Sequence, residues 1–494
     1  MKAVRSVLAL ALLQGLIACS TVGPDYHVPA SAALNKPAAQ AGFAGANDPA
    51  VSIAPVPDQW WQLYNDPTLN QLVQEALVHN ADLRVADANL RKAIALQNQV
   101  DAERDIDAKV GLAAKRAQEA GEQFLLTEKL PVINEGDFGI SLAYQIDLFG
   151  KLKRGEEAAD ANTQASLAAL DLARVNVAVQ TVRAYVQGCS AAHEYAVAQH
   201  ELDLQDQTVG IAQRLLKAGR GRDTDVIRAQ AQSDLLRANM PKYQAEQDVA
   251  RFRLAVMLGK APQELAPLDC KIEPALAQAL PVGDGTALLK RRPDIRQAER
   301  ELAGATAKIG IATAELYPSI AIGASAGLTG VIADMPSSPT ARWGFGPLLS
   351  WDIPGAGAHA RLRASEAGAD GALAHFDSVV LNALRETESA LTTYTHDLQR
   401  NADLRSARDK AHIVAQQNAQ LYKAGRSPYL TSLDATRTLA NADSALAASD
   451  SQLAQDQINL FMALGGGWQN SPAVAQIHAT ERAADKDKAP ANAE

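Results

Sequence analysis

The sequence predicts an α+β fold that is mainly α, with four transmembrane β-strands per chain and an internal tandem structural repeat. Three observations predict it. Hydrophobic residues make up 47% of the chain but aromatic residues only 5%, which favours long, closely packed helices over bulky globular cores. Four segments alternate apolar and polar residues with a period of two. Proline is absent between Pro131 and Pro241 and again between Pro354 and Pro428, so each half can carry an uninterrupted helix of about 60 residues.

The N-terminus reads as an export signal over residues 1–18. Two basic residues and an apolar run precede Leu16-Ile17-Ala18-Cys19, which resembles the bacterial lipobox. We expect Cys19 to be acylated and to become the first residue of the mature chain, at the start of a linker over 19–57. By resemblance to bacterial lipoproteins, in which Asp at the next position favours retention at the inner membrane, Ser20 implies sorting to the outer membrane. An ordinary signal peptide with a chance cysteine is the alternative.

Two halves of the chain repeat each other. Asn80-Ala81-Asp82-Leu83-Arg84 aligns with Arg292-Pro293-Asp294-Ile295-Arg296, and Leu216-Lys217-Ala218-Gly219-Arg220 aligns with Tyr422-Lys423-Ala424-Gly425-Arg426. Self-similarity at a fixed period indicates a repeated structural unit. We predict a first repeat over 58–283 and a second over 284–467, each running helix, strand, loop, strand and helical hairpin. A polar tail follows over 468–494.

The strands are predicted over about 104–118 and 135–149 in the first repeat and about 317–330 and 341–353 in the second. Each has an apolar face and a polar or small-residue face, and the aromatic residues of the strand segments cluster at the edges, which is typical of outer-membrane barrels. Soluble hairpins are the alternative. In a barrel we expect the charged and polar residues of the strand segments to face the lumen: Asp105, Asp107, Lys109, Asp137, Gln145, Asp147, Arg342 and Asp352.

The helical hairpins are predicted over about 155–259 and about 358–465. Gly219 and Gly425 stand where a left-handed residue ends a helix. We expect Ser427 to cap the helix that returns in the second hairpin, with Pro428 in its first turn, and Asp223 or Thr224 to cap the corresponding helix in the first. Pro241 is expected to kink that first returning helix, because it removes a hydrogen bond. A proline-rich belt follows over 262–283.

Two cysteines remain besides Cys19. Cys189 and Cys270 would lie in an oxidising compartment, but their separation in the sequence neither requires nor excludes a bridge. We expect two free thiols, and the disulfide stays open as the alternative.

Four strands cannot form a closed barrel alone. An open sheet in lipid would leave its edge N–H and C=O groups unpaired, at a cost of several kcal/mol each. Two chains would give eight strands with an interior filled by side chains, whereas three chains would give twelve strands and a wider lumen. We therefore predict a 12-stranded barrel shared by a trimer and continued by a long antiparallel α-helical barrel.

Several function classes are excluded. The net charge is −9 and no basic stripe is evident, so nucleic acid is not an expected partner. Gly355, Gly357 and Ala360 fit a dinucleotide-binding pattern, but the helix that follows is far too long for such a unit. His193-Glu194 and His200 lack the histidine pair of a zinc helix. We therefore expect no enzyme, no cofactor and no metal.

A family resemblance rests on longer motifs. Val22-Gly23-Pro24-Asp25-Tyr26 follows the expected lipidated cysteine, Trp60-Trp61 precedes Asp66-Pro67-Thr68-Leu69, and residues 291–320 read RRPDIRQAERELAGATAKIGIATAELYPSI. Together they resemble the outer-membrane efflux lipoproteins of the TolC-like superfamily, of the NodT type. The resemblance implies a homotrimeric outer channel of a tripartite resistance-nodulation-division pump, lipid-anchored in the outer membrane with a large periplasmic portion. Its partners would be a periplasmic membrane-fusion adaptor, an inner-membrane transporter and outer-membrane lipid.

The resemblance also implies a periplasmic gate. Residues 429–437 match the family pattern YLTxLDAxR, which places Leu430, Asp434 and Arg437 on one stripe of a helix. An ordinary solvated ion pair is the alternative. The first hairpin offers Asp225 and Arg228 without the leucine. We expect the two hairpin tips to contact the adaptor, although their cations could instead serve only the last carbonyls of their own helices. These tip residues are Lys217, Gly219, Arg220, Lys423, Gly425 and Arg426.

The expected function is that of a passive conduit for small toxic compounds. Two alternatives stay open at this point. One is an outer channel of type I secretion, and the other is a lipid-anchored periplasmic coiled-coil scaffold that has no pore.

Overall fold

The computed structural model describes residues 21–118, 120, 122, 125–270, 276 and 279–471, and it leaves the side chains of Asn47 and Ser338 undescribed. The expected signal peptide, Cys19 and most of the polar tail lie outside the described residues. The described chain is mainly helical and divides into two compact units. Unit 1 comprises Met1–Pro29, Asn89–Leu167 and Gln297–Phe376, and unit 2 comprises Ala30–Ala88, Ala168–Arg296 and Asp377–Glu494.

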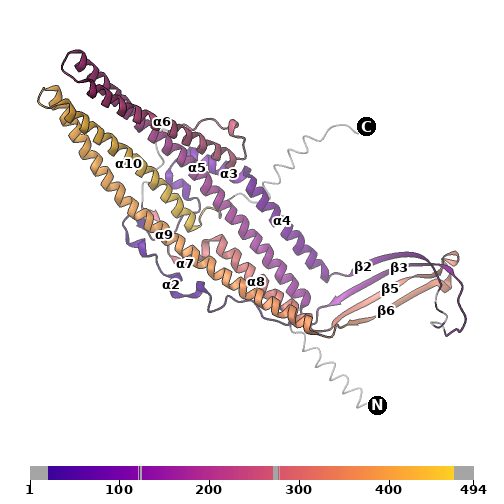
Figure 1. Cartoon of the computed structure of the whole chain (residues 1–494). Helices are drawn as coiled ribbons and strands as arrows, with labels where there is room; N and C mark the ends of the chain where they lie inside the picture. Colours follow the sequence, from indigo (N-terminus) through magenta and orange to yellow (C-terminus); the bar gives the residue numbers. More distant parts are fainter. Residues whose placement is uncertain are drawn as a thin grey trace. The chain divides into compact units, whose positions relative to one another are not determined.

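Unit 1 is built on a four-stranded antiparallel sheet. Its strands are β2 (Asp107–Ala117), β3 (Ile133–Ile146), β5 (Ser319–Val331) and β6 (Ala341–Ser350), in the order β2-β3-β5-β6 (Figure 1). Each lies within three residues of its predicted bounds at either end. Within the described part of the chain, β2 and β6 each have one strand neighbour, so both edges of the sheet are open.

The two faces of this sheet differ sharply in character. The register pairs Val110 with Ile140 and Leu112 with Phe138, and it pairs Ala324 with Phe345 and Ala326 with Trp343, so large apolar side chains share one face. Many of them are exposed, Trp343 to 84% and Leu112 to 83%. The opposite face carries mostly small, polar and charged residues, with apolar exceptions such as Val331 and Leu348. A sheet with one exposed apolar face and one polar face suits a lipid boundary on the first and water on the second.

Unit 1 also contains helical segments, and the N-terminal segment packs against two of them. These helices are the end of α4 (Ala81–Asp101), the start of α5 (Lys151–Lys217), most of α8 (Pro293–Ala314) and the start of α9 (Ala356–Lys423). The buried Arg154 of α5 donates hydrogen bonds to the carbonyls of Val22 and Gly23 and pairs with Asp25 at 2.8 Å. Tyr26 contacts Glu299 of α8. The Val22-to-Tyr26 motif therefore ties the N-terminal segment to α5 and α8.

Unit 2 contains two helical hairpins and shorter elements. The first hairpin joins α5 to α6 (Asp223–Met257), and the second joins α9 to α10 (Tyr429–Leu464), with the members of each pair side by side (Figure 1). The shorter elements are α2 (Pro37–Gln40), α3 (Pro67–His79), α7 (Gly285–Arg291), and the strands β1 (Val51–Ser52) and β4 (Leu280–Pro281), which pair in parallel.

The RRPDIR motif holds the end of α10 in unit 2. Arg291 donates to the carbonyl of Leu464 at 2.8 Å, and Arg292 donates to that of Ala463 at 2.9 Å. Gly465 then adopts a left-handed conformation, and a Cβ there would lie 2.7 Å from Arg292 Cγ. Charged donors on orphan C-terminal carbonyls stabilise a helix end. The motif is thus explained as a clamp on α10.

The starts of the two returning helices differ from prediction. Pro428 occupies the N-cap of α10 and Arg222 that of α6, and neither helix has a side-chain cap. The expected caps Asp223 and Ser427 are each one position off, because α6 already begins at Asp223 and α10 begins only after Pro428. Helix α6 continues as one helix through Pro241.

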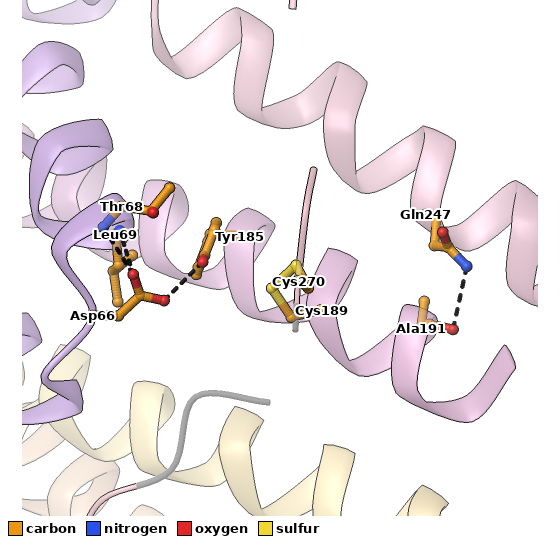
Figure 2. Close-up of a disulfide and its surroundings, with 8 residues drawn as sticks. All are labelled: Asp66, Thr68, Leu69, Tyr185, Cys189, Ala191, Gln247 and Cys270. Atoms are coloured by element: carbon orange, nitrogen blue, oxygen red, sulfur yellow. Dashed lines mark hydrogen bonds between the residues drawn. A yellow bond between two sulfur atoms is a disulfide. The ribbon is translucent and has the colours of Figure 1, made fainter. Parts of the chain in front are cut away.

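The expectation of two free cysteine thiols is wrong. Cys189 of α5 and Cys270 of the proline-rich segment form a disulfide with a Cα–Cα distance of 5.1 Å (Figure 2). The segment after α6 returns along α5, where Gly188 leaves room for Leu268 and Arg251 donates to the carbonyl of Leu265 at 3.0 Å. This return brings together two residues that are 81 positions apart, which sequence spacing could not indicate.

A capped helix start lies beside the disulfide. Asp66 accepts hydrogen bonds from the backbone N–H groups of Thr68 and Leu69 at the start of α3, and Tyr185 of α5 donates to its other carboxylate oxygen at 2.7 Å (Figure 2).

Among the described residues, no helix combines the length and the apolar character that a membrane span would need.

Candidate functional site

The tips of both hairpins in unit 2 have the same backbone structure. Gly219 and Gly425 both have φ of +68°. The N–H of Arg220 bonds to the carbonyl of Leu215, and that of Arg426 bonds to the carbonyl of Leu421. This is the Schellman arrangement, in which the left-handed residue lets the chain satisfy the last carbonyls of the helix. The predicted left-handed glycines are confirmed at both tips.

The four tip cations are exposed to solvent. Lys217, Arg220, Lys423 and Arg426 have no ion pair or side-chain hydrogen bond to any described residue. The backbone N–H groups of the turns already occupy carbonyls of the last helical turn. The alternative that these cations serve only their own helix ends therefore has no hydrogen-bond support.

Three residues of the expected gate lie on α10, near the second tip. Arg437 Nη2 lies 2.7 Å from Asp434 Oδ1, and both side chains are more than half exposed. Leu430 is 48% exposed. The three side chains follow one stripe of the helix, with spacings of four and three residues.

The structure adds the first hairpin to this stripe. A groove of about 390 Å³ is lined by Leu430, Leu433, Asp434 and Arg437 from α10 and by Arg228 and Gln232 from α6. The sequence pattern placed Arg228 in the first hairpin, which lacks the leucine of the gate pattern, and it gave no indication of Gln232. The repeat alignment could have drawn attention to Arg228, but only the fold brings α6 beside α10.

A further contact at the second tip was not predicted. Tyr429, the first residue of α10, donates its hydroxyl hydrogen bond to the carbonyl of Thr208 on α5 at 2.8 Å. Its ring lies 5.4 Å from that of Tyr422. Burial raises the pKa of Tyr429 to about 12, so the hydroxyl remains a donor at neutral pH. This hydrogen bond joins the start of α10 to the first hairpin.

The eight expected lumen residues fall into two groups. Five lie within the strands and share the polar face of the sheet in unit 1: Asp107, Lys109, Asp137, Gln145 and Arg342. The other three lie just beyond the strand ends. Asp147 accepts hydrogen bonds from the N–H groups of Leu152 and Lys153, so its carboxylate caps α5. Asp105 precedes β2, and Asp352 follows β6.

Three strands meet in one polar cluster on this face. Arg342 of β6 donates from Nη2 to both carboxylate oxygens of Asp137 on β3, at 2.9 and 3.0 Å, and from Nε to the hydroxyl of Thr329 on β5, at 2.6 Å. The Thr329 hydroxyl in turn donates to Asp137 Oδ2. Sequence analysis placed Asp137 and Arg342 on one face but missed both Thr329 and the contact between them.

The chain is similar to known proteins over most of its length. The chain matches the family described as "Outer membrane efflux protein" over residues 72–260 and 286–466. The probable efflux pump outer membrane protein TtgC of Pseudomonas putida is 29% identical over 488 residues, which cover 96% of this chain and 98% of that protein. The probable outer membrane lipoprotein SilC of Salmonella typhimurium is 26% identical, with coverage of 94% and 98%.

A solved structure extends this likeness to the fold. The outer-membrane channel OprN superposes with a TM-score of 0.84 and is 35% identical to this chain. The match covers 91% of this chain and all of that one.

Proposed function

The chain belongs to the outer membrane efflux protein family, and we propose on this premise that three copies close one sheet into a barrel that conducts small toxic compounds out of the cell. It is an outer-membrane efflux channel protein with a large periplasmic part. The proposed trimer rests on one observation: the sheet has one apolar and one polar face, and its edges at β2 and β6 are open. Because the four strands alternate in direction, β6 of one copy can pair antiparallel with β2 of the next.

Barrel size favours three copies over two. Eight strands enclose an interior that side chains fill, whereas twelve strands leave a lumen. The polar faces would then line water and the apolar faces would meet lipid, which is the arrangement that lipid tolerates. The two helical hairpins of each copy, as matching halves of an internal repeat, would continue the conduit as a helical barrel.

The second hairpin tip is proposed as the gate of this conduit. Leu430 would form a ring in the trimer, and the Asp434–Arg437 pair would hold the resting tips together. Their exposure on one stripe supports this role, because side chains exposed in a single copy are free to meet a neighbouring copy. The exposed cations and left-handed glycines at both tips are proposed to contact the periplasmic adaptor of a tripartite pump. An inner-membrane transporter of that pump would supply the substrate to the channel.

Cys19 is proposed to be the lipid anchor. A single lipid signal anchors a protein weakly, so a barrel that also inserts would secure it. The contacts of Arg154 with residues 22–25 support this proposal, because they hold the segment that follows Cys19 within unit 1, the unit that carries the sheet.

Purification and reconstitution test the proposed function. The full-length lipoprotein in detergent should have the mass of three copies, and it should form discrete channels in planar lipid bilayers. A uniform single-copy species that never carries current would contradict the proposal and would favour a scaffold without a pore.

A further inference from the structure

The charged residues on the polar face of the sheet form balanced pairs. Within the four strands, this face carries three acidic and three basic side chains. Asp107 pairs with Lys109 at 2.6 Å, Lys115 with Glu135 at 3.1 Å, and Asp137 with Arg342 at 2.9 Å. The chain as a whole is acidic, at −9. The strand face is therefore neutral in a protein that is not.

The Asp137–Arg342 pair differs from the other two because it crosses a strand. Arg342 is aligned with Gly327 of β5, and Gly327 is aligned with Gly139 of β3. A Cβ at Gly139 would lie 2.8 Å from Arg342 Nη2. The glycine therefore leaves the space in which the guanidinium lies across β5 and reaches β3.

The cluster is fixed in place yet open on one side. Four hydrogen bonds join Asp137, Thr329 and Arg342 in a ring of partners that spans three strands. Both charged side chains are still about 40% exposed on the polar face. Many neighbouring positions on this face are small, such as Ser141, Ser325 and Gly344, so the cluster projects beyond the surface around it.

We propose that the Asp137–Thr329–Arg342 cluster determines the ion selectivity of the barrel section by presenting passing solutes with a charge-balanced collar. The proposal rests on the trimeric pore described above, in which three copies of the cluster would face one lumen. Removing one partner leaves three like charges in that lumen, and their sign depends on which partner is removed. Each partner of the pair therefore controls ion selectivity in two ways, through its own charge and by neutralising the charge of the other.

Reversal potentials across a gradient of potassium chloride test this proposal in planar bilayers. Arg342→Gln should raise the ratio of potassium to chloride permeability, and Asp137→Asn should lower it. Three unpaired charges about 10 Å from a passing ion should change that ratio about twofold or more at low salt. The double variant should return to the wild-type value.

Arg116→Gln provides a matched control, because Arg116 lies on the same sheet but on its opposite face. It should leave the reversal potential unchanged. Variants that conduct but share the wild-type reversal potential, or that both shift it in one direction, would overturn the collar. A wild-type chain that forms no channel would instead contradict the proposed function. Migration of the trimer on a gel without heating verifies that each variant assembles.

Discussion

Two of the aspartate–arginine pairs in the described chain have the same chemistry but very different settings. On the sheet of unit 1, Asp137 and Arg342 belong to a ring of four hydrogen bonds that spans three strands. On α10 of unit 2, Asp434 and Arg437 are joined by one hydrogen bond on a single helix. Separating the first pair breaks hydrogen bonds among three side chains on three strands. The second can separate by rotation of two side chains.

From this difference we propose that the location of a pair, rather than its residue types, decides whether it lines the pore or closes it. An exposed pair on one helix typically contributes only a few tenths of a kcal/mol. Such a pair can exchange its partner for one on a neighbouring copy at little cost. We therefore expect the tip pair to control opening and the sheet pair to control selectivity.

Removing the tip pair should produce the largest effect. Asp434→Ala combined with Arg437→Ala should raise single-channel conductance several-fold, because three copies of the latch are lost together. The reversal potential should change far less than in the sheet variants. Asp234→Ala with Arg237→Ala removes another exposed pair of the same spacing, on α6, and should leave conductance unchanged. Equal conductance in the tip variant and this control would disprove the gate.

Arg228→Ala provides a graded version of this comparison. Arg228 reaches the same groove from α6 and has no ion pair with a described residue of its own chain. Its loss should raise conductance by less than the loss of the tip pair does. An effect as large as that of the double variant would place the latch between the hairpins rather than on α10.

Tyr429 tests what else holds the tip. Tyr429→Phe removes the hydrogen bond to Thr208 and should weaken the docking of α10 by about 1 kcal/mol. Amide hydrogen exchange should become faster over the first turns of α10. Tyr422→Phe keeps the neighbouring ring without removing that bond, so it serves as the control. Equally fast exchange in both variants would show that the hydroxyl does not matter.

A third carboxylate, Glu201, differs from both pairs because it has no ion pair with a described residue. Glu201 of α5 is buried and accepts a hydrogen bond from Ser444 of α10, while Asp443, which faces it, pairs with Arg408. Burial, with a smaller contribution from Asp443, raises the pKa of Glu201 from 4.5 to about 7.

A raised carboxyl pKa makes the folded state bind more protons than the unfolded state between these two values. The stability that Glu201 contributes is therefore full below pH 4.5 and is lost as pH rises through about 7. In Glu201→Gln, the free energy of unfolding measured by thermal unfolding should no longer fall over this pH range. The decline that is lost corresponds to the uptake of at most one proton per chain. An unchanged pH dependence in this variant would contradict the assignment.

Sequence patterns predicted the regular elements well. Strict alternation placed all four strands, and the Lys-Ala-Gly ends placed both left-handed glycines, because these features depend on local backbone geometry. Helix starts were each one residue off. Polar residues that could cap are common near helix ends, and their sequence does not fix which one adopts the extended cap conformation.

Contacts between distant segments could not be predicted from local patterns. The Cys189–Cys270 bridge depends on the return path of the chain after α6, and Thr329 joins its cluster only through the register of β3 with β5. Asp147 matched the alternation of its predicted strand, yet β3 ends at Ile146, three residues before the predicted end, and the Asp147 carboxylate caps α5 instead. In each case a partner far along the chain, or the exact end of a strand, decided the outcome.

Cross-linking of the two sheet edges tests the central claim most directly. Each variant chain would carry one cysteine on β2, at Lys109 or Gly111, and one on β6, at Gly344 or Gly346. All four positions share the polar face. Side chains at paired positions on adjacent antiparallel strands lie close enough to form a disulfide. The account predicts that at least one combination of these positions yields covalent trimers and no larger product, since three copies close the ring. Chains that remain single in every combination, or that extend into longer ladders, would contradict it.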